Sequence, residues 1–302
     1  MLKISVVLAA FNGEKYIKEQ LDSIENQSLP PFELIIIDDD SSDATRDIIE
    51  EYIGSSKLNI RFFKNEQNLG FFENFKKGLS LAEGDVCALC DQDDIWQPDK
   101  LKKLEEIFAD SFVYGCAAGF RFIDENGVCF ENEMLKGKTF AFLDRAPKTE
   151  LTKITLEQIS HRNIAPGCAC AYKKAVVDRF LASGVPDLPH DYQLSAIAAA
   201  LDGFYFYNKP LTRYRIHGKN TLGLKPLDQT RLDVAREKEK LGEAVSGASA
   251  KGKEYYDLSK KRAEYLKNKK PFKIIKMFFL KPYRRYYTLK ERLGDVVYAI
   301  GR

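Results

Sequence analysis

Short apolar segments alternate with helical patterns along the first hundred residues of the chain. Four apolar runs are too short for helices and are typical of strands buried on both faces of a parallel sheet. They lie at 3–10, 33–37, 58–64 and 85–90. Between them, apolar residues recur at helical spacing, which predicts helices that begin near residues 14, 44 and 71. This alternation predicts an α/β fold with a doubly wound, mostly parallel central sheet flanked by helices.

Polar residues follow each of the four predicted strands. These clusters lie at 11–12, 38–40, 68–70 and 91–94. In doubly wound sheets, ligands bind at the carboxyl ends of the strands. The sequence therefore predicts one ligand site to which all four clusters contribute.

Three carboxylates, those of Asp91, Asp93 and Asp94, stand at the end of the fourth predicted strand. Carboxylates this close repel one another, and a divalent cation relieves the repulsion. Oxygen ligands favour Mg²⁺ or Mn²⁺ over zinc. The alternative interpretation is an acidic turn that caps the next helix.

The second half of the chain is less regular. Strands are predicted at 113–123, 164–172, 204–207 and 211–216, and helices at 174–182, 191–201, 232–244 and 254–267. The stretch 134–152 is poorly patterned and is expected to form a loop over the site.

Charge is distributed unevenly along the chain. The net charge of the 302 residues is +3, but residues 251–302 carry 16 Lys and Arg against 5 Asp and Glu. Basic residues alternate with aromatic ones over 267–302, which favours contact with an anionic membrane surface. Nucleic acid is not expected as a partner because no reading module is visible. A solvated helical pair is the alternative.

The six cysteines show no zinc-binding pattern, because Cys87 and Cys90 have no second pair at similar spacing. All six are expected to be buried, reduced thiols, as in a cytosolic protein. The apolar segment at the N-terminus is too short for a signal peptide, and no stretch is long enough for a membrane span. These features predict a cytoplasmic chain, with the basic tail holding it peripherally at the inner face of the cell membrane.

Four motifs resemble those of the family 2 glycosyltransferases, which have the GT-A fold. They are SVVLAAFNG at 5–13, IDDDSSDAT at 37–45, NLG at 68–70 and DQDDIW at 91–96. Their order and spacing fit, and the likeness extends to about residue 220. The DQDDIW motif and the His-Asp segment at 190–191 are most similar to bacterial members of the rhamnosyltransferase type.

This resemblance implies a set of residues around the nucleotide of a sugar donor. Asp39 would accept a hydrogen bond from a pyrimidine N3–H, since uracil and thymine offer a donor there. Asp91 would reach the ribose, or the metal through water. The implied nucleotide-binding residues are Ala9, Phe11, Asn12, Glu14, Asp39, Asn68, Gly70 and Asp91.

The resemblance also implies the metal ligands and the base. Asp93 is expected to bind Mg²⁺ or Mn²⁺ directly, with Asp91 and His217 completing the site. Asp191, at a predicted helix start, would take the proton of the acceptor hydroxyl. The alternatives are that Asp191 only caps its helix and that His217 is an ordinary surface histidine.

Further residues are expected near the sugar or the acceptor. Arg215 would hold phosphate, and Gly167 would lie beneath the donor sugar. Trp96 would contact a sugar, or alternatively pack in the core. The implied sugar and acceptor residues are Asp94, Trp96, Gly167, His190 and Arg215.

Together these features predict an inverting glycosyltransferase. A GT-A domain is expected over 1–222, with a nucleotide-binding half at 1–110 and an acceptor half at 111–222, followed by a helical extension over 223–302. The expected donor is dTDP-rhamnose or a UDP-hexose, and the expected acceptor is a lipid-linked or polysaccharide hydroxyl. The alternatives are a non-catalytic membrane scaffold and a sugar-nucleotide pyrophosphorylase.

Overall fold

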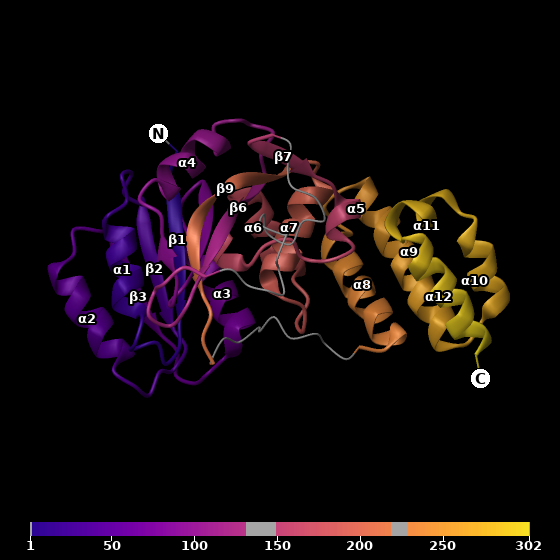
Figure 1. The fold of residues 1–302 in the computed structure, drawn as a ribbon, viewed down its shortest axis with the longest axis horizontal. Helices are drawn as coiled ribbons and strands as arrows, with labels where there is room; N and C mark the ends of the chain where they lie inside the picture. Colours follow the sequence, from indigo (N-terminus) through magenta and orange to yellow (C-terminus); the bar gives the residue numbers. More distant parts are fainter. Residues whose placement is uncertain (1, 131–148, 219–228, 302) are drawn as a thin grey trace.

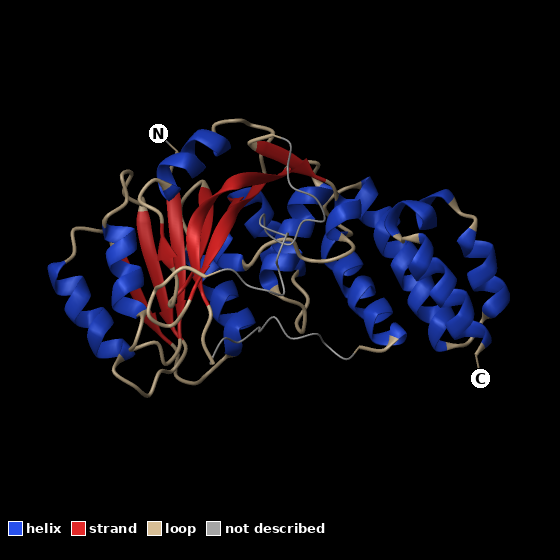
Figure 2. Cartoon of the chain, viewed as in Figure 1, coloured by secondary structure: helices blue, strands red, loops and turns tan. Residues whose placement is uncertain are grey.

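A large mixed sheet and a separate group of helices make up the molecule (Figure 1). The computed structural model describes residues 2–130, 149–218 and 229–301. The sheet and its flanking helices occupy one end, and the last helices of the chain occupy the other. Figure 2 shows strands confined to the first of these regions and helices alone in the second.

The first half of the chain builds the parallel part of the sheet, in the order β3-β2-β1-β4. Its strands are β1 (Ile4–Ala10), β2 (Glu33–Asp38), β3 (Ile60–Lys64) and β4 (Val86–Asp91). Its helices are α1 (Ile17–Glu25), α2 (Thr45–Ser55), α3 (Gly70–Leu81) and α4 (Lys100–Phe108). The predicted α/β alternation is confirmed here, with element ends within a few residues of those expected.

The second half extends the same sheet. β8 (Cys170–Lys173) is antiparallel to both β4 and β6 (Gly115–Ile123), and β9 (Phe204–Arg215) runs parallel to β6. The short strands β5 (Ile95–Trp96) and β7 (Leu151–Ile154) pair with β9. The remaining elements are α5 (Leu156–Ile159), a 3₁₀ helix (Gly167–Ala169), α6 (Lys174–Ser183) and α7 (His190–Ala200).

Alternating side chains of the central strands enter two cores on opposite faces of the sheet. On one face Val7, Ile35 and Leu89 pack with residues of α3, α6 and α7. On the other, Val6 and Leu34 pack with residues of α1 and α4. Because both faces are covered, β1 and β2 are apolar along nearly their whole length, as expected of parallel strands.

The last five helices pack into a bundle against α7 and α6. They are α8 (Arg231–Val245), α9 (Ala250–Lys267), α10 (Pro271–Phe278), α11 (Lys281–Tyr286) and α12 (Leu289–Ile300). Thr230 and Thr288 begin α8 and α12 with capping boxes, which satisfy the free backbone N–H groups of the first turn. None of the described helices is long and apolar enough to cross a lipid bilayer.

Several predictions of local structure need correction. The strands predicted at 204–207 and 211–216 are one strand, β9, with an irregular register opposite Gly119. The strand predicted at 164–172 is a 3₁₀ helix followed by β8. Most of the loop predicted at 134–152 lies outside the described residues, and its end forms β7. Cys129 is exposed rather than buried, and all six cysteines are free.

Candidate active site

A cleft of about 1110 Å³ opens at the carboxyl ends of β1, β2 and β4. The N-terminus of α7 and the segment after β9 close its other side. It brings together most of the residues expected to act on a substrate. The predicted residues that line it are Ala9, Phe11, Asn12, Glu14, Asp39, Asn68, Gly70, Asp91, Asp93, Gly167, His190, Asp191 and His217.

The loop after β1 is held by the side chain of Gln92. The Phe11 N–H donates to Gln92 Oε1, and Gln92 Nε2 donates to the Phe11 carbonyl, both at 2.8 Å. A Cβ atom at Gly13 would lie 2.0 Å from Gln92 Oε1, so any other residue here would have to displace this amide. The reciprocal pair fixes the ends of β1 and β4 relative to each other at the floor of the cleft.

Asp39 joins the end of β2 to the start of α3. Its carboxylate accepts from the N–H groups of Leu69 at 2.8 Å and Gly70 at 2.9 Å, and from Asn65 Nδ2 at 2.7 Å. Gly70 has φ +80°, a conformation that glycine adopts without strain. A carboxylate has about four acceptor positions. Asp39, which also lines the cleft, therefore keeps capacity for one ligand donor.

Several carboxyl groups lie close together at the end of β4. Burial, together with the negative charges of Asp93 and Asp191, raises the pKa of Asp91 to about 7. The Lys100 ammonium opposes this shift without cancelling it. Asp93 Oδ2 lies 2.7 Å from His217 Nε2, which brings a residue after β9 to the acidic cluster. The cluster thus has an excess of negative charge that a cation would relieve.

The two carboxylates of Asp91 and Asp93 offer oxygen ligands of the kind that Mg²⁺ and Mn²⁺ prefer. His217 also lines the cleft and adds an imidazole nitrogen, a ligand more typical of zinc, iron and copper. A tighter group of Asp91, Asp94 and Cys168, with ligand atoms within 4.8 Å, lies beneath. Burial raises the pKa of the Cys168 thiol well above its usual range, so this sulfur stays protonated and is a poor ligand.

Asp191 lies in the first turn of α7 and lines the cleft. Its Oδ2 accepts from Asn163 Nδ2 at 2.9 Å, and its Oδ1 accepts from the Tyr192 N–H at 2.8 Å. Only 7% of the residue is exposed, and this burial raises the pKa of its carboxyl to about 6. A carboxylate oriented by two hydrogen bonds, with a pKa close to neutrality, is suited to accept a proton.

His190 presents an imidazole whose two ring nitrogens have no hydrogen-bond partner in the described part of the chain. The ring stacks on Phe75 with centroids 4.2 Å apart and lies against the wall of the cleft. Burial lowers the pKa of His190 to about 3, so the ring is neutral at pH 7 and offers one donor and one acceptor. Unsatisfied buried polar groups are costly, which makes this ring a strong candidate for ligand contact.

Three predicted site residues do not line the cleft. Trp96 is 3% exposed and packs under the Lys100 ammonium, which lies 3.8 Å from the ring centroid, so it is a core residue rather than a sugar contact. Asp94 is fully buried and accepts from the Arg215 N–H at 2.9 Å. These positions were misassigned because the strand β5 turns the chain inward directly after Asp93.

Arg215 is also buried, at 1% exposure, rather than placed to hold phosphate. Its Nε donates to the Asp93 carbonyl at 2.7 Å, and its Nη2 pairs with Glu19 at 2.5 Å. The guanidinium also lies over the ring of Tyr16, 4.6 Å from its centroid. Arg215 therefore holds the backbone of Asp93 from the protein interior.

Sequence reasoning missed four residues that shape the site: Tyr16, Gln92, Lys100 and Asn163. Lys100 is buried and donates to the Cys168 carbonyl at 2.6 Å and to Thr212 Oγ1 at 2.9 Å. Its position among the other charged residues of α4 gave no sign of burial. Of the four, Gln92 could have been found from the sequence, because it lies inside the DQDDIW motif.

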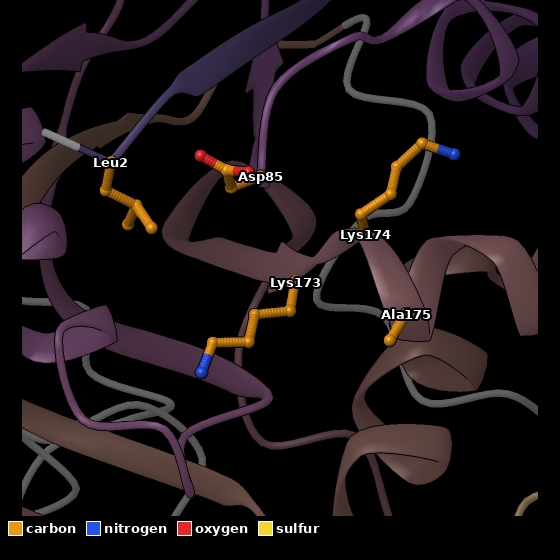
Figure 3. Close-up of a pocket in the computed structure, with 5 residues that line it drawn as sticks. All are labelled: Leu2, Asp85, Lys173, Lys174 and Ala175. Atoms are coloured by element: carbon orange, nitrogen blue, oxygen red, sulfur yellow. The ribbon is translucent and has the colours of Figure 1, made fainter.

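A second hollow, of about 520 Å³, lies at the opposite end of β4. Its lining residues are Leu2, Asp85, Lys173, Lys174 and Ala175 (Figure 3). The side chains of Lys173 and Lys174 point in opposite directions. Lys173 Nζ donates to the carbonyls of Asp110 and Ser111, at 3.0 and 3.1 Å. Because these two side chains diverge, they do not form a common binding site for one ligand.

Comparison with known proteins identifies the family. The family model described as "Glycosyl transferase family 2" matches residues 5–181, which is more than half of the chain. The chain belongs to glycosyl transferase family 2. The resemblance inferred from the four motifs is thereby confirmed, and membership supports an enzyme that transfers glycosyl groups.

Curated relatives in the family 2 group are similar over part of their length. An uncharacterized glycosyltransferase of Nostoc sp. is 27% identical over 226 residues, covering 72% of this chain and 66% of the relative. The putative teichuronic acid biosynthesis glycosyltransferase TuaG of Bacillus subtilis is 29% identical over 154 residues, covering 51% of this chain and 60% of the relative. The chain thus spans less than two thirds of the length of these relatives.

Solved structures confirm the expected GT-A fold of this family 2 member. S. aureus TarS 1–349 in complex with UDP-GlcNAc superposes with a TM-score of 0.63 at 20% identity, over 99% of this chain and 82% of that one. The mannosyltransferase PcManGT from Pyrobaculum calidifontis, in complex with GDP-Man and Mn²⁺, gives 0.54 at 14% identity, over 98% of this chain and 86% of that one. At these identities the likeness shows the fold alone.

Proposed function

We propose that this chain is an inverting glycosyltransferase that moves one sugar from a nucleoside diphosphate to an acceptor hydroxyl. The observation that carries the proposal is the single cleft shared by Asp39, Asp93 and Asp191. Asp39 follows β2, Asp93 follows β4, and Asp191 lies in the first turn of α7. The fold therefore gathers them from distant parts of the sequence. Each would serve a different part of the same substrate pair.

Asp191 is the proposed general base. Its carboxylate would take the proton from the acceptor hydroxyl as that oxygen attacks the anomeric carbon of the donor. The bond from this carbon to the diphosphate oxygen breaks as the new bond forms, which inverts the configuration. Asn163 and the Tyr192 N–H hold the carboxylate in place during proton transfer. Such positioned bases contribute about 10²–10⁴-fold to rate.

Asp93, Asp91 and His217 are the proposed ligands of Mg²⁺ or Mn²⁺. When bound there, the cation supplies Lewis-acid stabilisation of the leaving diphosphate. The excess negative charge around Asp91 supports this assignment, since the pKa of its carboxyl is raised in the absence of a cation. Arg215 holds the Asp93 backbone, which orients the proposed ligand.

We propose a pyrimidine nucleotide as the carrier of the donor sugar. Asp39 has acceptor capacity left for an N3–H, and the exposed ring of Phe11 lies in the same cleft. TarS, of the same fold, has been solved with UDP-GlcNAc, which agrees with a UDP-hexose donor. The likeness of the DQDDIW motif to rhamnosyltransferases favours dTDP-rhamnose as the other candidate. His190 is proposed to contact a sugar or acceptor hydroxyl through its unpaired ring nitrogens.

The proposed acceptor is a lipid-linked or polysaccharide hydroxyl in cell-surface glycan synthesis. TuaG is described as a putative teichuronic acid biosynthesis enzyme, which supports this class of acceptor. We propose that the GT-A domain spans 1–222 and works at the inner, cytoplasmic face of the membrane. Residues 223–302 would form the extension that contacts that surface.

A donor screen tests the proposal. The full chain is incubated with UDP-glucose, UDP-GlcNAc, dTDP-rhamnose and GDP-mannose, each with Mn²⁺ or with a chelator, and the released nucleoside diphosphate is measured. We expect slow, metal-dependent hydrolysis of one pyrimidine donor, and its loss in Asp93→Asn. Hydrolysis that is equal with and without metal would contradict the metal assignment. Release of no nucleotide from any donor would favour a non-catalytic scaffold.

A further inference from the structure

We propose that the outward sides of α10 and α12 dock on an anionic lipid surface. We call this surface the outer face, and its apolar residues are Phe272, Ile275, Phe279, Leu280, Leu289, Leu293, Val297 and Ile300. The inference deepens the proposed function, on which it rests for the lipid-linked acceptor. It also narrows the prediction that the segment 267–302 contacts a membrane to particular side chains of that segment.

Exposed apolar side chains are concentrated on the outer face. In the described parts of the chain, fourteen large apolar side chains are exposed, and eight of them lie between 272 and 300. Phe272 is 81% exposed, Phe279 73% and Val297 71%. Exposed apolar side chains that gather in one region mark an interaction site, whereas scattered ones do not.

The aromatic residues of α10, α11 and the residues that follow each helix include two distinct groups. Tyr283, Tyr286 and Tyr287 are buried inside the bundle, where they pack with α9. Phe272 and Phe279 point away from it and remain exposed. The tyrosines therefore stabilise the fold, and only the phenylalanines are available to a partner.

α10 is apolar on two sides, and α12 has an exposed apolar side opposite its buried one. In α10, Ile274 and Met277 enter the core, while Phe272, Ile275 and Phe279 follow the opposite side at helical spacing. In α12, Asp295 and Ala299 are buried, while Leu289, Leu293, Val297 and Ile300 line the other side. A soluble surface helix buries one side against the core. The exposed apolar side of each of these helices is therefore unexplained by folding.

α10 and α12 are neighbours, so their outward sides belong to one region of the molecule (Figure 1). The Arg292 guanidinium lies 4.7 Å from the Phe278 ring centroid, and Lys269 Nζ donates to the Tyr298 carbonyl at 2.8 Å. These contacts join opposite ends of the two helices, which therefore run antiparallel. The region lies at the far end of the molecule from β3.

Charge identifies the partner. Between 269 and 300, seven basic side chains are exposed and no acidic one is. The exposed basic residues are Lys269, Lys273, Lys276, Lys281, Arg284, Arg285 and Lys290, of which Arg285 is paired with Glu254 and Glu157. A second copy of this chain would place like charges opposite each other, which disfavours self-association through this surface. Apolar residues flanked by Lys and Arg match the boundary between anionic headgroups and acyl chains.

Co-sedimentation with vesicles tests the inference without any catalytic readout. The full chain is mixed with vesicles of phosphatidylglycerol alone and of phosphatidylcholine alone. We expect binding to phosphatidylglycerol, weakened by salt, and little binding to phosphatidylcholine. Lys276→Gln with Lys281→Gln should weaken binding about 25-fold, since each basic residue near the surface contributes about fivefold. Leu293→Ser with Val297→Ser should weaken it by about tenfold or more.

Matched controls come from exposed residues elsewhere. Lys57→Gln with Lys102→Gln and, separately, Phe112→Ser should leave vesicle binding unchanged, and circular dichroism confirms that each variant is folded. No binding to phosphatidylglycerol, or equal losses in the control variants, would overturn the inference. Self-association that Leu293→Ser with Val297→Ser abolishes would instead identify a second copy as the partner. Nucleotide binding measured on the same samples shows whether the proposed function stands independently.

Discussion

The cleft and the C-terminal bundle both contain buried aspartates, but the charges around these aspartates are opposite. In the bundle, Asp295 accepts from Arg262 at 2.7 and 2.9 Å, from Arg231 at 3.0 Å and from the Tyr283 hydroxyl. In the cleft, Asp91 lies among other carboxylates, and its pKa is raised to about 7. The charge of Asp295 is compensated within the protein, whereas the cleft leaves negative charge for a ligand to compensate. Asp295 therefore serves stability, and Asp91 is the residue that we propose serves binding.

The largest effect should come from the proposed base. Asp191→Asn keeps the shape of the side chain and removes its ability to take a proton, so transfer should fall by about 10²–10⁴-fold. Nucleotide binding should be retained, because Asp191 is hydrogen-bonded to Asn163 and Tyr192, whereas Asp39 is held by Asn65, Leu69 and Gly70. Steady-state transfer and calorimetry on the same sample measure both quantities. Unchanged turnover would remove Asp191 from its proposed role.

The complementary variant in the bundle should change stability instead. Asp295→Asn leaves Arg262 buried without a charged partner, which should lower the free energy of unfolding by about 3–5 kcal/mol. Denaturant unfolding measures this loss, with Asp257→Asn as an exposed control on α9. A loss no greater than that of the control would show that the buried pair does not stabilise the bundle.

Gly13→Ala should disturb the floor of the cleft. The added Cβ would displace the Gln92 amide and break its two hydrogen bonds to Phe11. Loss of two hydrogen bonds costs about 1–3 kcal/mol, and here we expect the cost to appear as weaker nucleotide binding. Gly54→Ala, on an open surface of α2, is the matched control. Equal affinities for the two variants would argue against a role for the Gln92 bridge.

The smallest expected effect is the pH dependence of transfer. The base must be ionised, and the pKa of Asp191 is raised to about 6, so the rate should rise as the pH increases through 6 and level off above it. Below the pKa the rate should fall about tenfold per pH unit. The same shift makes ionisation of Asp191 unfavourable to folding. The free energy of unfolding should therefore fall as the pH rises from the pKa that Asp191 has in the unfolded chain to the higher pKa that it has in the folded protein. A rate that is flat between pH 5 and pH 7 would contradict this assignment.

The sequence predicted the parallel half of the fold because each buried strand has its own apolar run. It also located the cleft, since the polar residues after β1, β2 and β4 must share one edge of the sheet. It failed where burial depends on distant segments. Trp96 and Lys100 are covered by β9 and the segment around Cys168, more than sixty residues away, and no local pattern reveals this.

The C-terminal region shows the same limit. Its aromatic and basic residues predicted a surface segment, yet Tyr283 and Tyr286 form part of a core. Local composition cannot separate residues that pack on α9 from those on the outer face, because both occur at helical spacing. Only the arrangement of α10 and α12 makes that distinction.

Calorimetry of nucleotide binding tests the central claim most directly. UDP and dTDP are titrated into the wild-type chain and into Asp93→Asn, each with and without Mn²⁺. If the carboxylates of the cleft hold a cation beside a pyrimidine diphosphate, Mn²⁺ should strengthen binding of at least one nucleotide to the wild type but not to Asp93→Asn. Binding that Mn²⁺ leaves unchanged, or strengthens equally in both proteins, would contradict the account.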